Sequence, residues 1–100
     1  MPDLTRHYLI SGRVQGVGFR AFAHRVAKAL HLSGWVRNLR DGRVEALVSG
    51  SAEKLAEWES QVRQGPGRAI VDAFLVREFA TAKSSGEFDV QPDGSEPWKE

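Results

Sequence analysis

Hydrophobic and polar positions in the first third of the chain predict a strand, a loop and a helix. Residues 5–11 alternate and place Tyr8 and Ile10 on one face, as in a half-buried strand. From Phe19 onward the apolar positions take a helical spacing. The stripe of this helix comprises Phe22, Val26 and Leu30, with Ala23 and Ala27 beside them. Ser33-Gly34 is expected to end the helix.

The rest of the chain predicts a hairpin, a second helix and two more strands. Residues 35–39 and 44–49 flank Asp41-Gly42, which favours a hairpin because both residues tolerate positive φ. Ser51 is a suitable N-cap for the next helix, and Gly65-Pro66-Gly67 is expected to stop it. The buried stripe of that helix is predicted as Leu55, Trp58 and Val62. Residues 69–79 and 87–90 predict a long and a short strand.

This order, β-α-β-β-α-β with either a split fourth strand or a short fifth strand added, predicts an α+β fold. Two helices on one face of an antiparallel sheet form the ferredoxin-like sandwich. We expect one domain over residues 1–90, since 100 residues leave no room for a second core. Residues 91–100 are rich in turn formers and are expected to form a flexible C-terminal tail.

Composition narrows the class of protein. Hydrophobic residues make up 41% of the chain, which is enough for a packed core and too much for a disordered segment. No apolar run approaches the roughly 18 residues of a membrane helix, and the N-terminus lacks the pattern of a signal peptide. The chain has no Cys, which excludes disulfides and thiolate chemistry. We therefore expect a cytoplasmic protein, a monomer, with no membrane partner.

Charge is divided unevenly between the two parts of the chain. Residues 1–43 contain eight Lys or Arg and two acidic residues, whereas residues 44–100 contain six Lys or Arg and eleven acidic residues. An anionic partner for the basic part is one interpretation, and segregated surface charge is the other.

A glycine-rich segment leads from the first strand into the first helix. Gly16 and Gly18 lack Cβ atoms, so backbone N–H groups can turn toward one point and a ligand can come close. The helix N-terminus adds unpaired donors, and Arg20 adds a full charge in a planar fork. These features suit a phosphate group. A tight turn with a surface Arg would carry the same glycines, and neither a Walker loop nor a G-x-G-x-x-G motif is present.

Longer motifs distinguish these interpretations. The chain contains G-R-V-Q-G-V-G-F-R at residues 12–20, G-W-V-R-N-L at 34–39 and D-G-R-V-E at 41–45. In this order and at this separation, the motifs closely resemble the acylphosphatase family. The resemblance covers about residues 5–90 and ends with Phe88-Asp89-Val90.

The resemblance implies hydrolysis of small-molecule acyl phosphates to a carboxylate and inorganic phosphate. It implies that Arg20 is catalytic and that Asn38 orients the attacking water. It also implies a substrate-binding cradle of backbone amides, formed by Gln15, Gly16, Val17, Gly18, Phe19 and Arg20. We expect no metal and no other cofactor, because Arg20 and the amides supply the charge.

Two other functions fit parts of the sequence. The predicted fold is shared by RRM domains, and residues 16–22 faintly resemble an RRM signature, although we expect them in a loop and a helix instead of a central strand. We therefore expect no nucleic-acid partner. The second alternative is a non-catalytic module that binds phosphate or carbamoyl phosphate, as in larger proteins with a similar domain.

Overall fold

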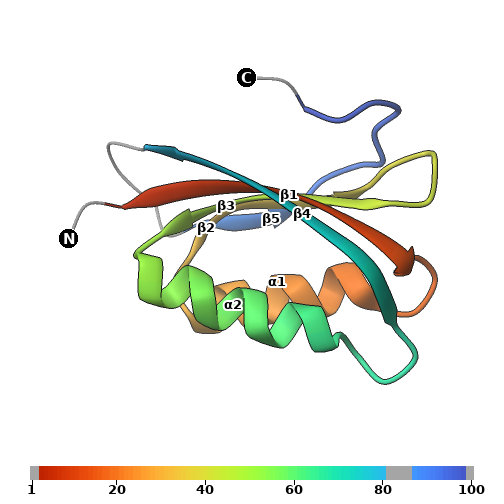
Figure 1. The fold of residues 1–100 in the computed structure, drawn as a ribbon, viewed down its shortest axis with the longest axis horizontal. Helices are drawn as coiled ribbons and strands as arrows, with labels where there is room; N and C mark the ends of the chain where they lie inside the picture. The colour runs from red at the N-terminus through yellow and green to blue at the C-terminus, as the bar shows by residue number, and fades with distance from the viewer. Residues whose placement is uncertain (1–2, 81–86, 99–100) are drawn as a thin grey trace.

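The computed structural model describes residues 3–80 and 87–98, which form a five-stranded sheet with two helices against one face (Figure 1). The predicted ferredoxin-like α+β fold is confirmed. The elements are β1 (Leu4–Arg13), α1 (Phe19–Ala29), β2 (Ser33–Asn38), β3 (Val44–Gly50), α2 (Ala52–Gln64), β4 (Ile70–Ala80) and β5 (Phe88–Val90).

The sheet is mixed, whereas the sequence predicted a purely antiparallel one. Its order is β4-β1-β3-β2-β5, and the β1–β3, β1–β4 and β2–β3 pairs are antiparallel. The short strand β5 instead pairs in parallel with β2, from Phe88 beside Gly34 to Val90 beside Val36. As a result, β5 ends next to the C-terminal end of β2, where Asn38 lies.

The hydrophobic core lies between the sheet and the helices. Tyr8 and Ile10 point into it from β1 and are fully buried, as their alternation predicted. The predicted stripe of α2 is also buried, and its Trp58 ring lies 4.8 Å from the Tyr8 ring. Ser51 caps α2 as predicted, because its side chain accepts a hydrogen bond from Lys54 N.

Helix α1 differs in two details from the prediction. Its most buried line includes Ala23, Val26 and Ala27, whereas Phe22 and Leu30 are only partly buried. The helix also ends at Ala29, before the predicted Ser33-Gly34 stop, and both of those residues belong to β2. Gly34 is required there for another reason: its φ is 132°, and a Cβ atom would clash with the backbone of Leu47 in β3.

After β5 the chain continues along the edge of β2 and then passes to the face of the sheet opposite the helices (Figure 1). Gln91 N and Gly94 N donate hydrogen bonds to Val36 O and Asn38 O, and Arg40 N donates to Gly94 O. Gln91 and Gly94 thus extend the hydrogen bonding of β2, and the flexible tail over residues 91–100 stays a prediction from composition. Residues 99–100 of that prediction lie outside the described part.

A buried carboxylate fixes the end of this segment. Glu45 of β3 is 0% exposed, and its Oε2 lies 2.7 Å from His7 Nε2 while accepting a 2.6 Å hydrogen bond from Trp98 N. Its Oε1 accepts a 2.7 Å bond from Arg37 Nε. A buried carboxylate needs such partners to offset its lost hydration. The Trp98 ring also packs on Phe79 and His7.

Candidate phosphate-binding site

The segment between β1 and α1 has the backbone of an anion-binding loop. Gly16 and Gly18 have φ of 73° and 77°, and nothing lies within 4 Å of a Cβ atom built on either. Glycine is therefore favoured by the left-handed backbone and not by crowding. Gly18 is the N-cap of α1, with no side-chain hydrogen bond to the cap and no acidic residue in the first turn. The N–H groups of that turn are available to an anion.

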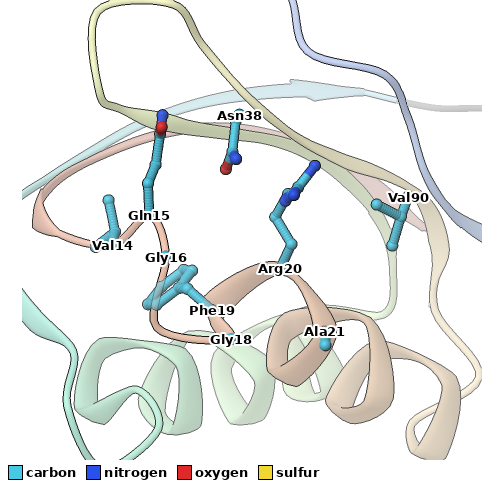
Figure 2. A pocket seen from close by; sticks show the side chains of 9 residues that line it. All are labelled: Val14, Gln15, Gly16, Gly18, Phe19, Arg20, Ala21, Asn38 and Val90. Atoms are coloured by element: carbon cyan, nitrogen blue, oxygen red, sulfur yellow. The ribbon is translucent and has the colours of Figure 1, made fainter.

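A cavity of about 300 Å³ lies over this loop (Figure 2). It is lined by Val14, Gln15, Gly16, Gly18, Phe19, Arg20, Ala21, Asn38 and Val90. The fold thus brings together every residue that the sequence placed in the site except Val17. The Val17 side chain packs against the core, so any contribution from this residue would come from its backbone.

Arg20 projects from the first turn of α1, and its side chain is 37% exposed. Its Nη1 atom lies 3.3 Å from Asp93 Oδ1, in the segment after β5. Figure 2 shows the Arg20 side chain extending from α1, beside the glycine loop, toward the part of the cavity where Asn38 lies. Asp93 was not foreseen as a neighbour of the site, because 73 residues separate it from Arg20 and its surroundings are rich in turn formers.

Asn38 is the last residue of β2, and Figure 2 shows its amide pointing toward the space between Gln15 and Arg20. The residue is 8% exposed, and its Oδ1 is buried without a hydrogen-bond partner among the described residues. Leaving a buried acceptor unpaired costs about 1–3 kcal/mol. Such an atom in a cavity is a good candidate for binding a water molecule.

Gln15 has a role that the sequence did not reveal. Its side-chain Nε2 donates hydrogen bonds of 2.8 Å to Leu39 O and 2.9 Å to Arg43 O. These bonds tie the glycine loop to the turn between β2 and β3, directly after Asn38. The Gln15 side chain therefore joins the glycine loop to the turn that follows Asn38. The sequence had predicted a role in the site only for the backbone amide of Gln15.

Apolar side chains form the remaining wall of the cavity. Val14 and Phe19 are almost fully buried, whereas Val90 of β5 is 45% exposed at the rim. Among the described lining residues Arg20 is the only charged one. The cavity therefore combines one cation and backbone donors with an apolar edge.

Other polar candidates from the sequence have structural partners elsewhere. Arg37 pairs with Glu45, and Arg43 pairs with Asp41, whose pKa is lowered by the hydrogen bond from the Arg43 side chain. His24 Nε2 lies 3.0 Å from Phe88 O.

Within residues 3–80 and 87–98, no three His, Asp or Glu side chains cluster closely enough to hold a metal ion. Over the same residues, neither helix has the length and hydropathy to cross a membrane.

Together, the fold and the loop define a ferredoxin-like α+β domain with a candidate phosphate-binding site between β1 and α1. The acylphosphatase family model matches residues 6–90, and the chain belongs to this family. A curated acylphosphatase from Alcanivorax borkumensis is 51% identical over 74 residues, which cover 74% of this chain and 80% of that protein.

Solved structures agree with this assignment. The crystal structure of an acylphosphatase from Bacillus subtilis matches with a TM-score of 0.84 and 35% identity, covering 88% of this chain and 98% of that one. Full-length HypF, in a phosphate- and nucleotide-bound form, matches with a TM-score of 0.82 and 26% identity. That match covers 94% of this chain but 13% of HypF.

Proposed function

We propose that the chain hydrolyses acyl phosphates to a carboxylate and inorganic phosphate, using Arg20, the glycine loop and Asn38. The observation that carries this proposal is that Arg20 and Asn38, 18 positions apart in the sequence, line one cavity with Gly16 and Gly18. Family membership supports the same reaction.

The phosphate group would bind to the loop amides and to the guanidinium of Arg20. A planar guanidinium forms two parallel hydrogen bonds with phosphate oxygens, and the first turn of α1 adds N–H donors. Phosphoryl transfer has a loose transition state, with charge spread over the equatorial oxygens. Positioning and charge stabilisation therefore supply most of the acceleration.

Asn38 would hold the attacking water through its unpartnered Oδ1, which can accept a hydrogen bond from the water. The water oxygen forms a bond to phosphorus, and the bond between phosphorus and the acyl oxygen breaks. The leaving carboxylate keeps that electron pair. The proton released by the water passes to an oxygen of the phosphate itself.

The types of residue that line the cavity suit an acyl phosphate substrate. A carboxylate, whose parent acid has a pKa of about 4, departs without being protonated. An alcohol is far more basic and would need a general acid. Among the described lining residues none is a carboxylic acid or His, so an acyl phosphate suits the cavity better than a phosphate monoester. Arg20 and the amides carry the charge, so the proposal requires no metal or other cofactor.

Release of phosphate from acetyl phosphate or benzoyl phosphate tests the proposal. The assay includes a chelator and, in parallel, a phosphate monoester. We expect enzyme-dependent turnover of the acyl phosphates in the presence of the chelator and little turnover of the monoester. Failure to hydrolyse either acyl phosphate by a folded chain would contradict the proposal, as would preference for the monoester.

The second candidate is a module that binds phosphate or carbamoyl phosphate without turnover. The observation behind it is that 94% of this chain matches 13% of full-length HypF, whose structure is of a phosphate- and nucleotide-bound form. Phosphate binding without hydrolysis in the same assay would select this candidate. An RNA-binding role has less support, because residues 16–22 form a loop and part of α1 and Phe19 is buried in the core.

The proposal extends to a cytoplasmic monomer that acts on a small molecule. The absence of Cys from the chain fits the reducing cytoplasm. Sedimentation of the purified chain would test the oligomeric state.

A further inference from the structure

We propose that Asp93 is an internal anion that holds Arg20 while the site is empty and competes with phosphate for it. This inference rests on the proposed function, because it takes Arg20 to be a phosphate ligand. In that role Asp93 sets the affinity of the site and favours release of the phosphate product.

The backbone on both sides of Asp93 is fixed against β2. Gln91 N donates a 2.9 Å hydrogen bond to Val36 O, and Gly94 N donates one of the same length to Asn38 O. Gly94 also forms an isolated parallel bridge with Leu39. The carboxylate of Asp93 is thus carried to the edge of the site by an ordered piece of backbone, although the side chain itself is 68% exposed.

The contact between Asp93 and Arg20 is weak enough for phosphate to replace Asp93 as the partner of Arg20. It is a single approach of 3.3 Å between Nη1 and Oδ1, and both side chains are partly in water. Exposed ion pairs of this kind are weak. Asp93 does not line the cavity, so the space over Gly16 and Gly18 stays open while the pair exists. An incoming phosphate can therefore reach the loop amides before Arg20 changes partner.

Bound phosphate would weaken the contact with Asp93 for two reasons. Binding through two parallel hydrogen bonds requires the guanidinium to turn its fork toward the phosphate. The phosphate dianion also repels the Asp93 carboxylate across a short distance. Removing the charge of Asp93 should consequently tighten the binding of phosphate and of substrate.

If Asp93 only positioned Arg20, removing its charge would change the affinity for phosphate in the opposite direction. If the carboxylate served mainly to orient Arg20 for binding, its loss would free the guanidinium and weaken phosphate binding. The sign of the change therefore separates competition from orientation.

The experiment measures the dissociation constant of inorganic phosphate by calorimetry for the wild-type chain, Asp93→Asn and Asp93→Glu. Asp89→Asn is the matched control, because it removes the same charge from an exposed position of β5, four residues earlier. Melting temperatures establish that all variants are folded. We expect the dissociation constant to fall about three- to fivefold in Asp93→Asn, the upper range for an exposed ion pair. Asp93→Glu should stay near the wild type, and Asp89→Asn should change little.

Steady-state kinetics with benzoyl phosphate add a second readout. In Asp93→Asn the KM should fall with the phosphate inhibition constant, and kcat should not rise, because product leaves more slowly. Unchanged or weaker phosphate binding in Asp93→Asn, beside a wild-type chain that binds phosphate, overturns this inference and leaves the proposed function intact. An equal gain in Asp89→Asn also overturns it. A wild-type chain that binds no phosphate overturns the proposed function and this inference with it.

Discussion

At the scale of single residues, the proposed site depends on two side chains with different tasks. Arg20 supplies charge at the N-terminus of α1, where the Gly18 cap leaves N–H groups available. Asn38 supplies a buried carbonyl oxygen that no described group satisfies. A phosphate held by the first and a water held by the second would meet in one cavity, which is the arrangement that displacement at phosphorus needs.

Arg20→Lys tests the first of these tasks. Lysine keeps the positive charge but loses the planar fork, and arginines that stabilise phosphoryl transfer contribute about 10³–10⁵ in rate. We expect kcat/KM to fall by about 10³ or more, with weaker phosphate inhibition and an unchanged circular dichroism spectrum. A folded Lys variant that keeps a tenth of the activity would remove Arg20 from the proposed mechanism.

Asn38→Ala separates chemistry from binding. The loop amides and Arg20 remain in this variant, so the phosphate inhibition constant should change little. Loss of one oriented polar contact in the transition state typically costs about 10²–10³ in rate, and we expect kcat to fall by that factor. Parallel changes in kcat, KM and melting temperature would instead indicate that Asn38 only shapes the end of β2.

At the scale of elements, the segment after β5 behaves as an addition to the sheet. Residues 91–94 bond to β2 and to the turn that follows it, and Trp98 N reaches the buried Glu45. Hydrogen bonds of this kind hold the backbone of neighbouring site residues in place. In this chain, the carbonyl of Asn38 is one of the bonded groups.

Deleting residues 91–100 should therefore destabilise the chain, contrary to what its composition suggests. The deletion removes the Trp98 donor from Glu45 and uncovers Phe79 and His7. Hydrogen bonds to charged groups contribute about 1.5–3 kcal/mol each. For a domain of this size, 1 kcal/mol corresponds to about 4–8 °C in melting temperature.

We expect a drop of at least about 5 °C in the calorimetric melting temperature of the chain that ends at Val90. A chain that ends at Trp98 is the control and should melt close to the wild type. A drop below one degree in the longer deletion would show that the contacts of this segment add nothing to stability.

At the scale of the whole molecule, local patterns predicted most of the fold. Alternation around Tyr8, the hairpin at Asp41-Gly42 and the Ser51 cap each depend on neighbours in sequence. Each was found, although Gly42 alone of the two turn residues has a positive φ. The glycine loop and Arg20 of the candidate site were predictable from local sequence, whereas Asn38 was predictable only through the resemblance to a family, because no local rule brings it to the same cavity as Arg20. The Gln15 bonds and the Asp93 contact could not be predicted, since their partners lie 24 to 73 residues away.

The central claim is that water attacks phosphorus in the cavity that Arg20 and Asn38 share. Hydrolysis of benzoyl phosphate in water enriched with a heavy oxygen isotope tests it most directly, with both products analysed by mass spectrometry. Attack on phosphorus puts the new oxygen into inorganic phosphate, because the bond between phosphorus and the acyl oxygen is the one that breaks. We predict one heavy oxygen in the phosphate per turnover and none in the benzoate. Heavy oxygen in the benzoate would mean attack on the carbonyl carbon and would contradict the roles given to Arg20 and Asn38.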